Sequence, residues 1–351
     1  MRILDEHPST VFPDPLDATA PAPAEARGLE RDQVRLLVAG PGGITHTRVR
    51  DLAAHLSAGD VVVFNDSATV AGQLDAEQDG GGPVVLHLAT PLENGTWVVE
   101  VRTAPDASRA VLDARPGDRF RAGAVSVELL EPYPRPGSSP TSAGNRLWSA
   151  QVGGPLADRL ASRGRPIAYG YLPRRYPLAP YQTNVGTPPG SAEMPSAGRP
   201  FTAQVLADLV VRGVAVAPVT LHTGVSSQEA GEAPQPERFA VPASTARLVN
   251  AVHSGGGRVV AVGTTVTRAL ESAYDGGRLV ERSGWTERVV TPADPPRVVN
   301  GLVTGWHDPQ ASHLLLVEAV AGRVLAQQAY DAAVAGEYLW HEFGDLALLL
   351  P

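Results

Sequence analysis

The spacing of apolar residues changes twice along the chain. In the first 66 residues, and again after residue 155, short apolar runs alternate with segments whose apolar residues recur at helical spacing. Between residues 70 and 152, short β-rich runs alternate with turns containing Gly and Pro. The first pattern predicts an α/β domain and the second a small barrel. We therefore expect a larger α/β domain with a mixed sheet, formed by residues 1–66 and 156–351, interrupted by an inserted β-barrel domain at residues 67–155.

The same pattern predicts the individual elements. Thr202 is expected to cap one helix and Ser244 or Thr245 another, because these side chains accept from backbone N–H groups. The expected strands of the α/β domain are residues 34–39, 45–49, 60–64, 214–221, 259–262 and 298–304, and its expected helices are residues 51–56, 156–163, 202–212, 244–252, 264–273, 313–329 and a last helix and tail from 332. The expected barrel strands are residues 84–89, 96–102, 119–120, 124–130 and 146–152. The remaining segments are an extended lead-in at residues 1–27, with residues 12–16 packed on the core, and loops at 131–144, 164–179 and 225–237.

Residues 258–272 combine a buried strand with the start of a helix. Gly263 lets the chain turn sharply after the strand, and Thr264 or Thr265 can cap the helix. Free backbone N–H groups at such a terminus suit a carboxylate or a phosphate. Arg268, one turn into the helix, can add a two-pronged contact to a carboxylate. The alternative is an ordinary strand–helix joint with a surface arginine.

Three predicted strands end in residues that can carry chemistry. His222 follows one strand, Thr264 and Thr265 follow the second, and His307 follows the third. In α/β sheets, ligands bind beyond the carboxyl ends of the strands. If the three ends are neighbours, two imidazoles suited to proton transfer near neutral pH face one pocket. A structural role for each histidine is the alternative.

The composition excludes several kinds of chemistry. The chain has no cysteine, and its 29 basic residues are all arginine. Disulfides, thiolate nucleophiles, cysteine-bound metals, a phosphate-binding loop lysine and a Schiff-base lysine are therefore excluded. The nine histidines show no i, i+4 pair and no HExxH motif, so we expect no metal. No apolar run approaches the roughly twenty residues of a membrane span, and no signal pattern opens the chain, so we expect a cytoplasmic protein.

The charge distribution gives opposing indications about nucleic acid. A formal net charge of −8 is unfavourable for general binding to a polyanion. However, a stretch of arginines and tyrosines can pair with phosphates and stack on bases, and a structural loop is the alternative. This stretch contains Arg165, Arg174 and Arg175, interleaved with Tyr169, Tyr171 and Tyr176.

Taken together, the strand-end motifs resemble one known family. The chain is similar to the S-adenosylmethionine:tRNA ribosyltransferase-isomerases of the queuosine pathway, and the matching motifs occur in family order over almost the whole chain. They are residues 59–66 (GDVVVFND), 195–198 (PSAG) with Phe201, 219–224 (VTLHTG), 260–265 (VAVGTT) with Arg268 and 270–272 (LES), 298–304 with His307 and Pro309, and 343–345 (FGD).

The resemblance implies an α/β domain interrupted by a small β-barrel. It also implies that S-adenosylmethionine acts as a co-substrate that donates its ribosyl group. In the family this group passes to a 7-aminomethyl-7-deazaguanine base of tRNA and is isomerised to the epoxycyclopentanediol of epoxyqueuosine, while adenine and methionine leave. No metal is implied.

The resemblance also suggests roles for particular residues. His222 or His307 is the expected base that removes a C5′ hydrogen made acidic by the sulfonium, and Arg165, Arg174 and Arg175 are the expected contacts to tRNA. The expected contacts to S-adenosylmethionine are Asn65, Asp66, Ser196, Gly198, Thr220, Gly263, Thr264, Thr265, Arg268 and Thr304.

The chain departs from the family mainly in its acceptor half. Asp66-Ser67-Ala68 lacks an arginine of the family motif, and Gly198-Arg-Pro-Phe201 lacks a histidine. Two alternatives therefore stay open. One is an enzyme of the same scaffold that cleaves or rearranges S-adenosylmethionine with a small-molecule acceptor or none, and the other is a non-catalytic nucleoside-binding protein. The sequence leaves open the acceptor, the stereochemistry and which histidine is the base, and for the oligomeric state it favours a monomer.

Overall fold

The computed structural model describes residues 4, 6–13, 18–137, 143–226, 231–309 and 311–351. Its central strand, β3 (Val61–Asn65), is buried along its whole length. Val61 and Val63 pack into one apolar cluster, and Val62 and Phe64 pack into another on the opposite face of the sheet. Because both faces are covered, the strand is a continuous apolar run, as is typical of central parallel strands.

Nine strands form the main sheet, in the order β17-β13-β12-β3-β14-β18-β19-β1-β2. The four central strands β12, β3, β14 and β18 are mutually parallel. Besides β3, the strands are β17 (Arg282–Thr286), β13 (Glu237–Val241), β12 (Ala215–His222), β14 (Val259–Val262), β18 (Gly301–Thr304), β19 (Leu346–Leu349), β1 (Arg35–Gly40) and β2 (Gly43–Arg48). The carboxyl ends of the central strands therefore share one edge.

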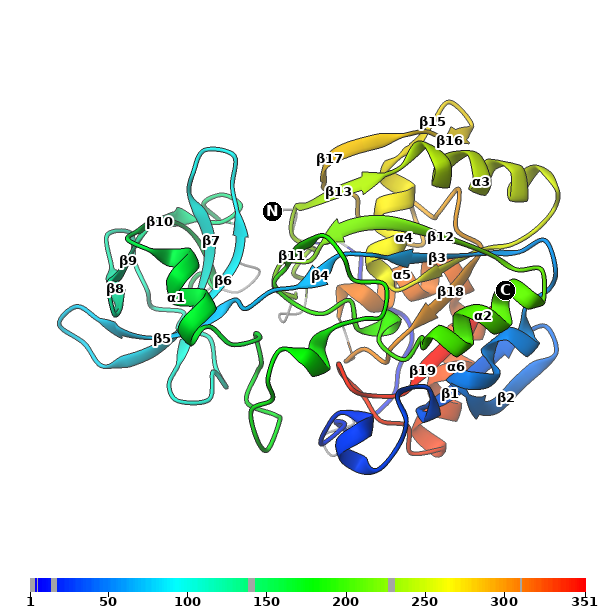
Figure 1. Cartoon of the computed structure of the whole chain (residues 1–351), viewed down its shortest axis with the longest axis horizontal. Coiled ribbons are helices and arrows are strands. Elements are labelled where there is room, and N and C mark those ends of the chain that lie inside the picture. Colours follow the sequence, from blue (N-terminus) through cyan, green and yellow to red (C-terminus); the bar gives the residue numbers. More distant parts are fainter. Residues whose placement is uncertain (1–3, 5, 14–17, 138–142, 227–230, 310) are drawn as a thin grey trace.

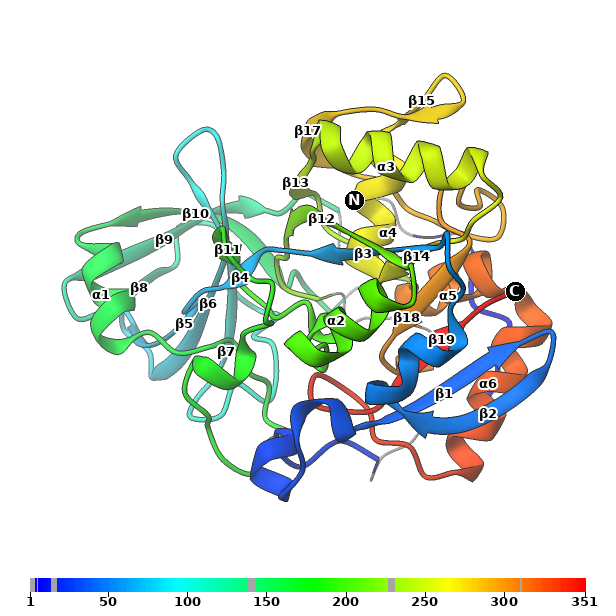
Figure 2. The same ribbon diagram turned by 45° about the vertical axis from the view of Figure 1, so that its right-hand side comes forward.

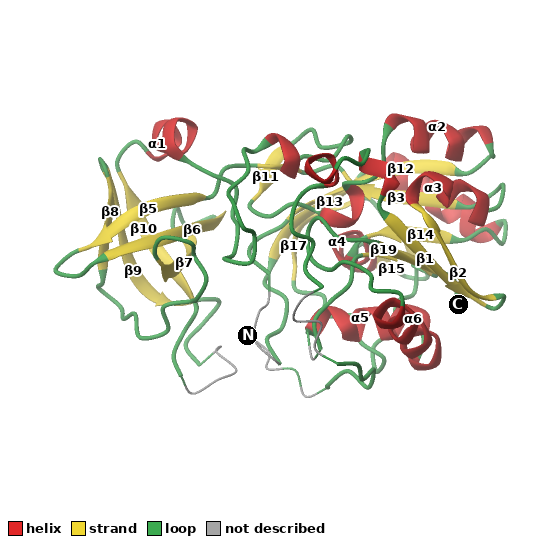
Figure 3. Cartoon of the chain, turned by 90° about the horizontal axis from the view of Figure 1, so that it is seen from below, coloured by secondary structure: helices red, strands yellow, loops and turns green. Residues whose placement is uncertain are grey.

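Helices cover both faces of this sheet. One cluster contains apolar residues of α3 (Ala243–Ser254), α4 (Thr264–Ser272), α5 (Ser312–Ala321) and α6 (Arg323–Ala335). The other contains residues of α2 (Ala203–Val211) and the 3-10 helix η3 (Val49–His55). Figure 3 shows the sheet between α2 on one side and α5 and α6 on the other, and Figure 2 shows α6 beside β1 and β2.

A closed barrel forms a separate lobe beside the α/β domain (Figure 1). Its strand order is β10-β7-β6-β5-β8-β9, and its core contains Trp148 and Phe120, both buried. The strands are β5 (Gln73–Gln78), β6 (Pro83–Pro91), β7 (Trp97–Thr103), β8 (Arg119–Ala122), β9 (Val125–Pro132) and β10 (Leu147–Gly153). The predicted fold class, an α/β domain with an inserted barrel, is confirmed. The barrel strands lie inside the range 67–155 that the sequence predicts for the insertion.

Two connections join the lobes. The outgoing chain passes through β4 (Ala68–Thr69), and the return passes through α1 (Leu156–Arg163) and β11 (Pro189–Ser191), which pairs in parallel with β4. The remaining elements are β15 (Tyr274–Asp275), β16 (Arg278–Leu279) and the 3-10 helices η1 (Ala24–Arg27), η2 (Arg31–Gln33), η4 (Ala179–Tyr181) and η5 (Ser196–Gly198).

The structure corrects several predicted elements. The expected long helix at residues 313–329 is two helices that meet at Gly322, whose φ of 75° leaves the helical region. The expected last helix and tail from residue 332 instead contain the end of α6 and the buried strand β19. Thr202 does cap α2, but α3 and α4 begin after Pro242 and Gly263 without a side-chain cap. Thr245 donates to the Pro218 carbonyl oxygen at 2.6 Å, so its hydroxyl holds a strand rather than a helix end.

Phe12 packs on the core as predicted, against the rings of Tyr330 and Trp340. Residues 14–16 of the expected lead-in, and residues 138–142 and 227–230 of the expected loops, lie outside the described residues. No helix within the described ranges is long and apolar enough to cross a membrane.

Candidate active site

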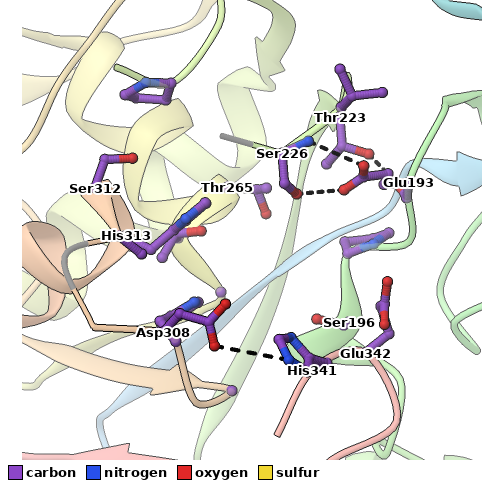
Figure 4. Close-up of a pocket in the computed structure, with 18 of the residues that line it drawn as sticks. Glu193, Ser196, Thr223, Ser226, Thr265, Asp308, Ser312, His313, His341 and Glu342 are labelled. Atoms are coloured by element: carbon purple, nitrogen blue, oxygen red, sulfur yellow. Dashed lines mark hydrogen bonds and ion pairs between the residues drawn. The ribbon is translucent and has the colours of Figure 1, made fainter. Parts of the chain in front are cut away.

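A cavity of about 580 Å³ lies at the carboxyl ends of β12, β14 and β18. This size is typical of pockets for small ligands. The barrel contributes Arg102 and Ser108 to its wall, and the segments 169–171, 193–197 and 341–342 contribute the side that faces the strand ends. Figure 4 shows side chains from several of these segments pointing into the space.

The N-terminus of α4 forms part of the cavity wall. Gly263 has a φ of 95° and donates its N–H to the Val303 carbonyl oxygen, which turns the chain from β14 into the helix. Thr264 and Thr265 are the first helical residues, and both line the cavity. The first N–H groups of a helix have no acceptor inside the helix, so this terminus can bind an anionic group.

Arg268 lines the cavity, but its guanidinium has protein partners. It is 5% exposed and forms an ion pair with Glu237. It also donates to the carbonyl oxygens of Gln235 at 2.8 Å and Arg288 at 3.0 Å. The expected two-pronged contact to a ligand therefore competes with a structural role that joins α4 to β13.

The cavity contains a pair of stacked histidines. The rings of His307 and His313 are 4.9 Å apart and nearly parallel, and His307 Nε2 lies 2.9 Å from Thr304 Oγ1. Burial lowers the pKa of His307 well below its usual range and that of His313 to about 4, so both rings are neutral at pH 7. His313 was not predicted, because it sits on a helix rather than at a strand end.

His222 does not line this cavity, although the sequence predicts that it faces the same pocket as His307. Its Nδ1 lies 2.8 Å from Ser67 Oγ, and Ser67 in turn accepts a hydrogen bond from Ser191. A Cβ at Gly190 would lie 2.4 Å from the same Nδ1, so the imidazole is packed tightly between segments. Burial lowers the pKa of His222.

The other expected contacts to S-adenosylmethionine divide into two groups. Ser196, Gly263, Thr264, Thr265 and Thr304 line the cavity, whereas Asn65, Asp66, Gly198 and Thr220 do not. Asn65 is buried and bonds both the N–H and the carbonyl of Leu221. Asp66 accepts from the Thr220 hydroxyl at 2.6 Å. Asn65 and Asp66 therefore join the end of β3 to β12.

The main residues that the sequence did not predict are carboxylates on loops. Glu193, Glu342 and His341 all line the cavity (Figure 4). Tyr169 and Tyr171 line it as well. Tyr169 and Tyr171 were expected to stack on a base, but burial raises the pKa of both hydroxyls, and Tyr169 donates to Glu193. No local pattern distinguishes these glutamates. Within the described part of the chain, no three His, Asp or Glu side chains are arranged to hold a metal ion.

The arginines expected to contact tRNA lie at the junction of the two lobes and have partners there. Arg165 donates to Asp75 at 2.7 Å, Arg174 lies over the Tyr176 ring at 4.8 Å, and Arg175 donates to a backbone carbonyl. Arg174 and Arg175 are nevertheless exposed.

Comparison with known proteins identifies the relatives of the chain. The model of a family described as "Queuosine biosynthesis protein" matches residues 11–349. An S-adenosylmethionine:tRNA ribosyltransferase-isomerase of Thermus thermophilus is 36% identical over 337 residues, which are 91% of this chain and 93% of that protein. The enzyme of the same name from Acidiphilium cryptum is 35% identical over 336 residues, with the same coverage.

A solved structure gives the same result. The crystal structure of the S-adenosylmethionine tRNA ribosyltransferase of Thermotoga maritima matches with a TM-score of 0.53 and 26% identity, covering 97% of this chain and 99% of that one. The resemblance inferred from the strand-end motifs is thereby confirmed. The chain belongs to the queuosine biosynthesis protein family of S-adenosylmethionine:tRNA ribosyltransferase-isomerases.

Proposed function

We propose that this protein transfers the ribosyl moiety of S-adenosylmethionine to a 7-aminomethyl-7-deazaguanine base of tRNA, isomerises it, and releases adenine and methionine. The observation that carries the proposal is the cavity at the strand ends, in a chain that matches the family over residues 11–349. Its volume suits a nucleoside-sized ligand, and a helix N-terminus, neutral imidazoles and carboxylates all reach it.

The methionine carboxylate is placed at the backbone N–H groups of Thr264 and Thr265. The positive end of the helix dipole and these N–H groups both favour an anion there. Thr304 and Ser196 line the same cavity and supply hydroxyls for the rest of the donor. Arg268 supports this terminus from within the fold, because it holds α4 against Glu237.

His307 is the proposed base for the C5′ hydrogen. A neutral imidazole can accept a proton, and in the tautomer whose Nε2–H donates to Thr304 Oγ1 the acceptor nitrogen is Nδ1. We expect His307→Ala to lower the rate of adenine release by about a hundred- to ten-thousandfold. The comparison variant is His222→Ala, because the imidazole of His222 lies outside the cavity. An equal loss in both variants, or none in His307→Ala, contradicts the assignment.

The reaction itself can be tested directly. The purified protein is incubated with S-adenosylmethionine alone and with tRNA that carries 7-aminomethyl-7-deazaguanine, and adenine, methionine and the modified base are measured by mass spectrometry. Release of adenine and methionine with a ribosyl-derived addition to the tRNA is expected. If adenine is released neither with S-adenosylmethionine alone nor in the presence of the tRNA, the proposal is refuted.

One set of contacts favours a second candidate, transfer to a small amine rather than to tRNA. The net charge is −8, and the arginines at the lobe junction are held by Asp75, Tyr176 and a backbone carbonyl. In the same experiment, free 7-aminomethyl-7-deazaguanine serves as the small acceptor. Adenine release with the free base and not with tRNA would favour this candidate.

A further inference from the structure

Glu193 is held in place at the cavity wall by three donors. Its Oε1 accepts from the Tyr169 hydroxyl and from the Ser226 N–H at 3.1 Å, and its Oε2 accepts from the Ser226 hydroxyl. An ionised carboxylate oxygen accepts two hydrogen bonds, so Oε2 has capacity for one more donor. Figure 4 shows the carboxylate on the opposite side of the view from His313, with Thr265 between them.

The two arginines that line the cavity are matched by carboxylates other than Glu193. Arg102 pairs with Glu100, and Arg268 pairs with Glu237. Glu342 is a second carboxylate whose charge acts on Glu193; it interacts with the Tyr171 hydroxyl, and its Oε2 is buried without a hydrogen-bond partner among the described residues. This side of the cavity is therefore suited to a cation.

Aromatic rings complete the same wall. Tyr169 and Tyr171 line the cavity, and their ring centroids are 6.4 Å apart. Arg102 already lies over the Tyr169 ring and His341 stacks on Tyr171, so the rings bound the site and the carboxylates are the groups that accept from a cation. The chemistry that fits this wall is a positively charged group with N–H donors.

We propose that Glu193 binds the primary ammonium group of the acceptor and removes one of its protons. The assignment rests on the proposed function, in which that amine becomes bonded to the transferred group. In the step, one N–H bond breaks, its electron pair stays on nitrogen as the nucleophilic lone pair, and the proton moves to Oε2 of Glu193, which becomes a neutral carboxylic acid. Tyr169 and Ser226 are positioning residues that aim the carboxylate.

The surroundings suit this proton transfer. Burial raises the pKa of Glu193 to about 7, and Glu342 acts in the same direction, while the hydrogen bonds from Ser226 and Tyr169 oppose the rise. A base whose pKa lies near the working pH is the most effective. The hydroxyls of Tyr169 and Tyr171 stay protonated, because burial raises the pKa of each well above its usual range.

The first experiment measures binding rather than turnover. Calorimetry at pH 7 compares 7-aminomethyl-7-deazaguanine with its 7-hydroxymethyl analogue, which lacks the positive charge. The wild type should bind the amine about ten- to a hundredfold more tightly, as for one charged hydrogen bond. Glu193→Gln should lose this preference, and Glu193→Asp should retain it. Glu281→Gln, at an exposed position of the same domain, is the matched control and should bind as the wild type does.

The second experiment measures the pH dependence of kcat/KM. The wild-type rate should rise with pH and level off above about pH 7, since the carboxylate must be ionised to accept the proton. Glu193→Gln should lack this rise and fall by about a hundred- to ten-thousandfold at pH 7. Ser226→Ala removes a donor that favours the charged carboxylate, so it should shift the rise to higher pH.

The outcomes separate the two proposals. A wild type without preference for the amine, or a Glu193→Gln variant that keeps it, overturns the role of Glu193. An unchanged pH profile in both Glu193→Gln and Ser226→Ala also overturns it. A wild type that prefers the amine but releases no adenine supports the amine site and refutes the proposed ribosyl transfer.

Discussion

At the residue scale, Arg268 is predicted from the sequence to contact a ligand, but in the structure it is buried and bonded to other residues of the protein. Its pairing with Glu237 inside the fold means that Arg268→Ala would leave a buried carboxylate without its cationic partner, with only the Gly224 N–H still donating to it among the described residues. We expect this change to lower the free energy of unfolding by about 3–5 kcal/mol. Urea unfolding checks it, with the exposed Arg278→Ala as a control that should change stability by less than about 0.5 kcal/mol. Unchanged stability together with weakened S-adenosylmethionine binding would restore the ligand role.

His313 predicts a dependence of stability on pH. Its pKa in the fold, about 4, is below the usual 6.5, so the unfolded state takes up the proton first as the pH falls. The contribution of neutral His313 to the free energy of unfolding is therefore fully present above pH 6.5. As the pH falls from 6.5 to about 4, the free energy of unfolding decreases by about 3 kcal/mol for this reason. His313→Gln should remove this part of the slope. Urea unfolding of the wild type and of His313→Gln at pH 7.5 and 4.5 measures this difference. An equal loss of unfolding free energy between the two pH values in both proteins would contradict the prediction.

At the element scale, the strands and the joint at Gly263 were predictable because their signals are local. A buried strand, a glycine and a helical repeat lie within fifteen residues of each other, at residues 258–272. The caps of α3 and α4 were not predictable in the same way, since Thr245 bonds Pro218 on a neighbouring strand instead of its own helix end. Strand β19 was missed for a related reason. A run of four apolar residues fits a helix or a strand equally, and only pairing with β1 and β18 decides between them.

The break between α5 and α6 gives a prediction about one glycine. Gly322 ends one helix and starts the next with φ 75° and ψ 150°, a conformation that other residues rarely adopt. Gly322→Ala should lower the free energy of unfolding by about 1–3 kcal/mol.

The control for this change is Gly42→Ala, because a Cβ there meets nothing within 4 Å and the backbone φ is not positive. Urea unfolding of both variants tests the difference. Equal stability of the two variants would show that the helices can join without the glycine.

At the scale of the whole molecule, the site depends on contacts that no local pattern encodes. Glu100 of the barrel bonds Arg102 at 2.7 Å and Arg146 at 2.9 Å, and Arg146 bonds Glu232 of the α/β domain at 2.7 Å. Arg102 also lies over the ring of Tyr169, whose hydroxyl donates to Glu193. The barrel therefore supports the cavity wall through a buried chain of charges. The sequence predicted the strand-end side of the cavity but not this wall, because the wall combines loops far apart in the chain.

The net charge of the whole molecule makes tRNA binding the most exacting test of the acceptor. If tRNA is the partner, the exposed Arg174 and Arg175 at the junction of the lobes are the expected phosphate contacts. Affinity should then fall by about 0.7–0.9 log units per tenfold increase in salt for each contact. Replacing both arginines by alanine should reduce the slope of log affinity against log salt by the amount expected for about two phosphate contacts. Binding of S-adenosylmethionine should stay unchanged, because neither residue lines the cavity.

Filter binding across a salt series measures this slope, and Arg278→Ala on the hairpin of β15 and β16 is the matched control. A slope unchanged by the double substitution would place the tRNA elsewhere. Absence of tRNA binding at low salt, in a protein that still consumes S-adenosylmethionine, would shift the acceptor to a small amine. In that case the amine preference of Glu193, rather than a basic surface, would determine what the enzyme modifies.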